Sequence, residues 1–126
     1  GIKGVTVRSR AALAATVTDA LEADAFLLIT PANFGYMSGA LKHFFDQIYY
    51  QCRLDTVGSP YAAIVHGNND TGGAVRAIET IATGLQWEAA ARPVAVIGEP
   101  SDADVASCRE LGATLAALIM PDDDTA

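Results

Sequence analysis

The sequence predicts an α/β protein in which a parallel sheet is covered by helices. Short apolar runs at Ala25–Thr30, Tyr61–His66 and Val94–Ile97 have the length of strands, and a continuous apolar run is typical of a strand covered on both faces. Each run is followed by a longer segment with helical spacing of its apolar residues. Strands that alternate with helices in this way imply βαβ units and therefore parallel pairing.

Besides the run at Ala25–Thr30, the first third of the chain is predicted to contain a further short strand, a helical turn and the start of a helix. Val5–Ser9 alternates apolar and polar residues, which predicts a short strand before the first apolar run. Thr16–Asp24 predicts a brief helical turn, with Asp19 and Glu22 in solvent. Ser38 can cap the following helix. The apolar stripe of that helix consists of Leu41, Phe44, Phe45, Ile48 and Tyr49.

Two further helices follow the later strands. The first runs from about Gly73 to Trp87, and its inward residues are Val75, Ile78, Ile81, Ala82 and Leu85. Ser101 caps the last helix, whose acidic first turn suits the helix dipole. Its inner stripe is Val105, Cys108, Leu111, Leu115, Leu118 and Ile119. Pro121 and Asp122–Asp124 end the domain, the latter as a frayed tail.

Length and composition limit the classes of function. The 126 residues form a single domain, residues 1–126, and the net charge of −7 argues against nucleic acid and against anionic membrane surfaces. No apolar run is long enough to cross a membrane, and no signal peptide is visible. Cys52, in a connection, and Cys108, on an apolar helix face, form neither a disulfide framework nor a metal site. A reducing cytoplasm is the simpler setting.

The loop after the first apolar run carries the most informative residues of the chain. In an open α/β sheet, ligands bind at the carboxyl ends of the strands. This loop offers polar groups, an aromatic face, and a glycine that lets the backbone approach a flat ligand. The candidate binding residues here are Thr30, Pro31, Ala32, Asn33, Phe34, Gly35, Tyr36 and Met37.

A second glycine-rich loop follows the next strand. Its candidate binding residues are His66, Gly67, Asn68, Asn69, Asp70, Thr71, Gly72 and Gly73. Two readings stay open for this loop: a ligand site, or a plain turn followed by a helix cap at Asp70 or Thr71. His66 is the one candidate for a catalytic proton or hydrogen-bond donor, and the alternative is a histidine satisfied by backbone groups.

One run of residues resembles the flavodoxin-like FMN-binding oxidoreductases, in their NAD(P)H-dependent FMN reductase and quinone reductase branch. The run is Thr30, Pro31, Phe34, Gly35, Met37, Ser38, Gly39, Leu41, Lys42, Phe44 or Phe45, and Asp46. The resemblance continues more weakly to about Ile119. It implies a flavodoxin-like three-layer α/β/α sandwich with strand order 2-1-3-4-5. It also implies FMN as cofactor, with both loops against its ring, NAD(P)H as reductant and a small-molecule electron acceptor. Relatives in this branch form dimers or tetramers, so together with Tyr50 and Trp87 it favours a homo-oligomer.

The resemblance also shows what the sequence does not contain. If Val5–Ser9 is the second strand of the family's fold, the first strand, the first helix and the phosphate-binding loop between them are missing. The strand at Ala25–Thr30 would then have a bare edge. We therefore expect the protein to begin further upstream. Two alternatives stay open: strand exchange with a partner, or a smaller four-stranded α/β domain.

The leading functional hypothesis is an oxidoreductase that passes hydride from NAD(P)H through bound FMN to a quinone, a flavin or a similar small acceptor. Lys42, Arg53 and Arg76 could attract the phosphate of the nicotinamide cofactor, although a solvated surface explains them equally well. His43 is expected in solvent, and no metal site is expected. The alternatives are a flavodoxin-type electron carrier and a flavin-free flavodoxin-like module.

Overall fold

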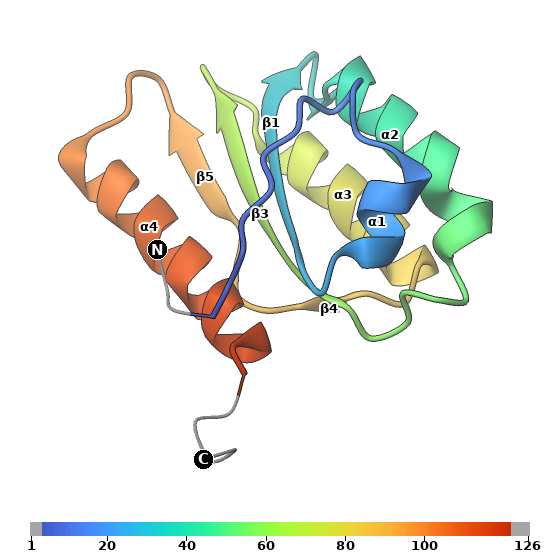
Figure 1. The fold of residues 1–126 in the computed structure, drawn as a ribbon. Coiled ribbons are helices and arrows are strands. Elements are labelled where there is room, and N and C mark those ends of the chain that lie inside the picture. Colours follow the sequence, from blue (N-terminus) through green and yellow to red (C-terminus); the bar gives the residue numbers. More distant parts are fainter. Residues whose placement is uncertain (1–3, 122–126) are drawn as a thin grey trace.

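The computed structural model describes residues 4–121, which form a mainly parallel sheet with helices on both faces (Figure 1). In these residues β1 (Phe26–Asn33), β3 (Pro60–Gly67) and β5 (Val94–Ile97) run parallel, with β3 in the middle. The short β2 (Tyr36–Met37) pairs antiparallel with the end of β1, and β4 (Glu88–Ala89) pairs with the start of β3. The predicted α/β class and its parallel pairing are confirmed.

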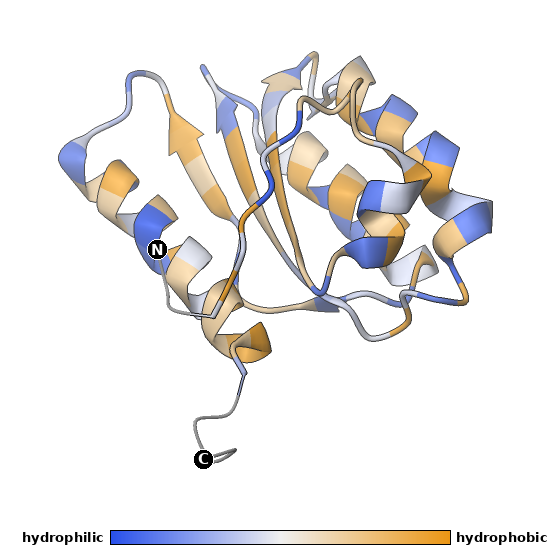
Figure 2. Ribbon diagram, in the orientation of Figure 1, coloured by the Kyte–Doolittle hydropathy of each residue, from blue (hydrophilic) through white to orange (hydrophobic). Residues whose placement is uncertain are grey.

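The helices form the outer layers of a three-layer sandwich. On one face of the sheet, α2 (Gly39–Cys52) and α3 (Gly72–Gly84) enclose the main core, and the short α1 (Val17–Glu22) packs beside α2. On the other face, α4 (Asp102–Ile119) packs over β3 and β5. Figure 2 shows hydrophobic residues along the strands, and hydrophobic and hydrophilic residues alternating along the helices. The strands predicted at the three apolar runs and the three long helices are thus present.

The main core is organised around Trp87, which lies just after α3. Its ring stacks on Phe26 with centroids 4.0 Å apart, and its indole N–H donates a hydrogen bond of 2.8 Å to the buried Thr56 hydroxyl. The Trp87 side chain is buried in the core and is therefore not available for the subunit contact considered from the sequence. Tyr49 is half-buried against the same core, and its hydroxyl lies 3.3 Å from the Gly84 carbonyl oxygen.

Helix ends follow the predicted capping, with one refinement. The Ser38 hydroxyl accepts from the Leu41 N–H, and Ser101 forms a reciprocal capping box with Asp104. Helix α3 ends at Gly84, earlier than expected. The Gln86 and Trp87 N–H groups then donate to carbonyls of the last turn, with Gln86 at φ 60°. This is a Schellman ending, whose left-handed position usually holds glycine.

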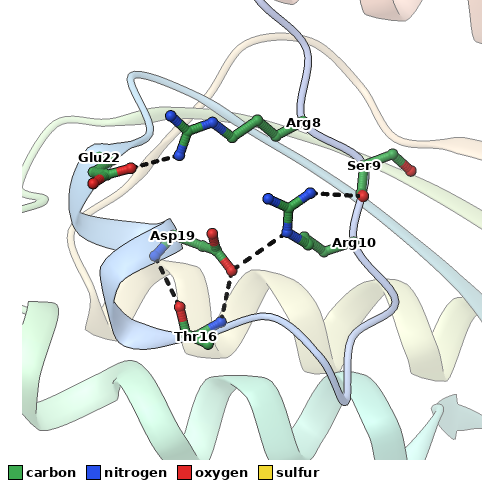
Figure 3. Close-up of polar contacts among 6 residues, drawn as sticks. All are labelled: Arg8, Ser9, Arg10, Thr16, Asp19 and Glu22. Atoms are coloured by element: carbon green, nitrogen blue, oxygen red, sulfur yellow. Dashed lines mark hydrogen bonds and ion pairs between the residues drawn. The ribbon is translucent and has the colours of Figure 1, made fainter.

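The prediction of a strand at Val5–Ser9 is wrong for this structure. The segment is an exposed, irregular chain that is held to α1 by side chains: Arg8 pairs with Glu22, and the Arg10 Nε lies 3.8 Å from an Asp19 carboxylate oxygen (Figure 3). Asp19 and Glu22 are therefore ion-paired and not merely solvated. Alternation alone does not make a strand, because a strand also needs a neighbour for its backbone hydrogen bonds.

One edge of β1 is bare over most of its length. Within residues 4–121, Phe26–Pro31 pairs with β3 on one side and with no strand on the other, where β2 reaches only Ala32 and Asn33. On the face covered by α4 elsewhere, Leu27 and Ile29 remain 42% and 65% exposed. The bare edge expected from the sequence is present. The upstream strand that we expect to cover it stays a prediction.

Two details of the later chain differ from the predictions. In α4 only Leu111 and Leu115 of the expected stripe are buried, while Val105 and Leu118 are exposed. Within residues 4–121, no second helix covers this face of the sheet beside α4. Cys108 is correspondingly half-buried. The Asp122–Asp124 tail lies outside the described residues.

Cys52 does not lie in a connection but in the last turn of α2, where it is fully buried. Burial raises the pKa of its thiol, which disfavours the reactive thiolate. Among residues 4–121, no helix has both the length and the apolar character needed to span a bilayer.

Candidate functional site at the carboxyl edge of the sheet

The first loop is a tight hairpin with an aromatic residue at its tip. β1 and β2 pair at Asn33 and Tyr36, which leaves Phe34 and Gly35 as the turn. Both have positive φ, 51° and 71°, as a type I′ turn requires. This conformation strains a residue with a bulky side chain by about 1–2 kcal/mol. The turn leaves the Phe34 ring fully exposed to solvent.

The base of the hairpin is fixed from inside. The buried Thr30 hydroxyl accepts a 2.9 Å hydrogen bond from the Ser38 N–H and donates a 2.8 Å bond to the Pro31 carbonyl. The Met37 side chain is also buried in the core. Thr30 and Met37, two of the predicted binding residues, therefore hold the loop in place, whereas Asn33, Phe34 and Tyr36 are exposed.

The second loop lies directly against this hairpin. Pro31 of β1 is in register with His66 of β3, so the two loops leave the sheet at the same edge. A Cβ placed on Gly73 would lie 1.8 Å from the Gly35 carbonyl oxygen, and a Cβ on Gly67 would lie 3.1 Å from the Cβ of Ala32. The structure thus brings the two predicted loops together, and glycine at position 73 is what allows the contact.

The start of α3 presents unpaired backbone groups at this edge. Thr71 occupies the N-cap position, but its side chain makes no capping hydrogen bond, so the cap considered for it does not form. Within the described residues, the Gly72 and Gly73 N–H groups have no hydrogen-bond partner. The Asp70 side chain lies between the hairpin and α3, because a Cβ on Gly35 would be 3.1 Å from one of its carboxylate oxygens.

A third loop, which the sequence analysis did not single out, reaches the same edge. It follows β5 and begins at Gly98, whose φ is 71°. The His66 Nε2 lies 2.6 Å from the Gly98 carbonyl oxygen. A carbonyl oxygen only accepts, so Nε2 carries a hydrogen and donates this hydrogen bond. The Gly98 N–H in turn donates to the Gly67 carbonyl at 2.8 Å. The glycine directly after a strand was the available sequence signal.

The three candidate cations differ in their distance from these loops. Lys42 bonds Asp46 at 2.6 Å on α2, and Arg53 lies at the far end of that helix. The Arg76 side chain instead folds back, with one guanidinium nitrogen 3.2 Å from the position of a Cβ on Gly72. His43 is exposed on α2. Nowhere in residues 4–121 do three His, Cys, Asp or Glu side chains gather as metal ligands would.

Known structures share this fold. A flavodoxin from the domain Archaea matches with a TM-score of 0.72 at 20% identity, over 83% of this chain and 71% of that one. An NADPH-quinone reductase from P. pentosaceus matches at 0.57 and 18% identity, over 80% and 70% of the two chains. Rubredoxin oxygen:oxidoreductase from Desulfovibrio gigas matches at 0.66 and 19% identity, over 76% of this chain but only 23% of that one.

At identities this low, the structural similarity establishes the flavodoxin-like fold but no shared activity. No curated protein sequence matches the chain. The family of NADPH-dependent FMN reductases, in contrast, matches residues 5–101, which include both loops and the strands that carry them. Its cofactor is FMN and its reductant NADPH. The chain therefore belongs to the NADPH-dependent FMN reductase family.

Proposed function

We propose that the carboxyl edge of the sheet binds FMN and that the protein passes hydride from NADPH to a small acceptor, a quinone or a flavin. The observation that carries this proposal is the strained, fully exposed Phe34 at a hairpin tip in contact with a second glycine-rich loop. A solvent-exposed aromatic ring in a left-handed turn contributes nothing to the core. Backbone strain of this kind persists where a ligand uses it.

The residues at this edge fit a flat cofactor with a polar rim. Phe34 and Tyr36 offer aromatic surface for one face of the ring, and Pro31 shapes the turn. The free N–H groups at the start of α3 suit the ring oxygens and the negative charge that develops on reduction. The glycines at positions 35 and 73 keep the backbone bare where these groups meet.

FMN supplies the hydride chemistry when it is bound, and the protein's part is to bind, orient and tune. Thr30 holds the hairpin at a fixed angle to α2 and so fixes where the Phe34 ring lies. Arg76, folded toward the second loop, is the cation best placed to attract a nicotinamide phosphate. His66 orients the third loop through Gly98 and is not free to act as a proton donor in this arrangement.

We further propose, as expected from the sequence, that the protein forms a homo-oligomer and works in the cytoplasm. Tyr50, which is 81% exposed on α2, supports a subunit contact, while Trp87 no longer does because it is buried. A reductase and an electron carrier differ in one measurable property. The reductase oxidises NADPH continuously in the presence of a quinone, and the carrier does not.

The test uses the purified protein with FMN added and the variant Phe34→Asn. Asparagine is favoured in a type I′ turn, so the variant should be more stable in urea by about 1 kcal/mol. The same change should weaken FMN binding at least tenfold, as measured by flavin fluorescence quenching. Phe34→Tyr, which keeps an aromatic ring, is the matched control and should bind FMN like the parent. A parent protein that does not bind FMN, or a Phe34→Asn variant that binds it equally well, would refute the proposal.

A further inference from the structure

A cavity of about 270 Å³ lies beside the first half of β3, between the sheet and α3, and plays no part in the site described above. Its walls include the buried Ala63 and Ile78, and its rim carries Glu79 and Arg92. The loops of the FMN site follow Gly67, six positions beyond Tyr61, or about 20 Å along the strand. The part of the cavity wall formed by Tyr61 therefore lies away from the carboxyl edge, whereas Val75, which also lines the cavity, is two positions from Gly73.

The cavity exists because the strand next to β3 is interrupted. β4 pairs with Pro60 and Tyr61, and β5 resumes the pairing only at Ile64. The connection between them, residues 90–93, leaves the sheet, so nothing pairs there with Ala62 and Ala63 in the described structure. Alanines at positions 63, 89 and 91 line the resulting space without filling it.

The Tyr61 side chain is the one polar group in the buried wall of this cavity. It is only 7% exposed. No side-chain oxygen of the described residues is both fully buried and without a hydrogen-bond partner, so the Tyr61 hydroxyl, which bonds no other residue there, is open to solvent. Its ring packs against Trp87 with centroids 6.2 Å apart, which holds the hydroxyl in place. Burial, and secondarily the carboxylate of Glu79, raises the pKa of Tyr61, so the hydroxyl stays a hydrogen-bond donor at neutral pH.

We propose that this cavity binds a small, flat, neutral aromatic carbonyl compound whose oxygen accepts the hydrogen bond of Tyr61. The size follows from the volume: an apolar cavity of about 150 Å³ holds one benzene ring, so 270 Å³ accommodates two fused rings. Neutrality follows from the rim, where one acidic and one basic residue leave no net charge. The carbonyl follows from the Tyr61 hydroxyl, the one polar side-chain group of the buried wall and a donor that solvent, and therefore a ligand, can reach.

The experiment compares 1-tetralone with tetralin, which has the same fused rings but no carbonyl. Calorimetric titration of the full chain should show 1-tetralone binding about fivefold more tightly, the contribution of one neutral hydrogen bond. Amide chemical shifts should change at Tyr61, Ala63 and Arg92 and remain constant in the loops of the FMN site. Equal affinity for the two compounds, or no binding of either, would overturn the proposal.

Two variants test the role of the Tyr61 hydroxyl and the role of the cavity volume separately. Tyr61→Phe should bind both compounds equally, at the parent's affinity for tetralin. Ala91→Phe adds a ring to an exposed lining residue, so the protein should fold while binding of both compounds is lost. The matched control is Ala117→Phe on the exposed side of α4, which should bind like the parent. A parent-like Ala91→Phe variant would place the ligand elsewhere and contradict the inference.

Discussion

Replacing Gly73 by alanine tests the contact between the two loops most directly. In the structure a Cβ at this position would lie 1.8 Å from the Gly35 carbonyl oxygen and 2.8 Å from its carbonyl carbon. Both contacts are with backbone, which cannot turn aside as a side chain can. Real Cβ atoms stay at least 3.0 Å from other non-bonded heavy atoms. The hairpin or the start of α3 must therefore move by no less than 1.2 Å.

The cost of this movement can be set against the gain in helix propensity. Overpacking of a well-packed contact costs about 1–3 kcal/mol. Alanine in place of glycine inside a helix returns up to about 1 kcal/mol. We therefore expect Gly73→Ala to lower the free energy of unfolding by about 1–2 kcal/mol. For a chain of 126 residues each kcal/mol corresponds to roughly 3–5 °C in Tm.

The neighbouring Gly72 provides the matched control. A Cβ there would lie 3.2 Å from the end of the Arg76 side chain, which is flexible and can move away. Gly72→Ala should thus leave stability unchanged or raise it by up to about 1 kcal/mol. Urea unfolding followed by the fluorescence of Trp87 measures both variants. If Gly73→Ala is as stable as Gly72→Ala, the loops are not in the contact described, and the geometry of the proposed FMN site loses its basis.

Three further predictions concern the parts that support this edge. Thr30→Val should lower stability by about 1–3 kcal/mol in urea, because the Ser38 N–H loses its buried acceptor, whereas Thr30→Ser should not. Gln86→Gly should raise Tm, since glycine removes a left-handed strain of about 1 kcal/mol, and an unchanged Tm would contradict this account of the helix end. The Thr16 N–H holds the pKa of Asp19 below its ordinary 3.8, so the stabilisation from Asp19 is present above that pH and lost as pH falls through the lowered pKa. Asp19→Ala should therefore be less stable than the parent at pH 6, with the difference shrinking toward pH 2.

Elements with a complete local signal were predictable from the sequence. The apolar runs of β1, β3 and β5 and the caps at Ser38 and Ser101 were found where expected, because each depends on residues within a few positions. Both candidate loops also lie at one edge, since parallel neighbouring strands must bring their carboxyl ends together.

Elements that depend on distant partners were not predictable. Val5–Ser9 has the alternation of a strand but no neighbouring strand in the described structure. Two of the six residues of the α4 stripe, Val105 and Leu118, are exposed, because no helix among residues 4–121 covers the adjoining part of that sheet face. The β1–β2 hairpin was missed for a different reason. Its turn is Phe34–Gly35, whereas the usual sequence signal for a type I′ turn is Asn-Gly or Asp-Gly.

That mismatch separates Phe34 from the other strained residue of the fold. Among residues 4–121, only Phe34 and Gln86 have positive φ without being glycine. The strain at Gln86 has a structural reason, because the Schellman ending directs Trp87 into the core. The strain at Phe34 has no such reason within residues 4–121: the ring is fully exposed and asparagine would suit the turn better. A residue that violates a local preference without a compensating contact in its own chain is expected where a ligand supplies that contact. Phe34 lies on the loop that contacts the start of α3, where two backbone N–H groups are free. We propose that one ligand accounts for both features: its flat face packs on the Phe34 ring, and its polar rim accepts hydrogen bonds from these N–H groups.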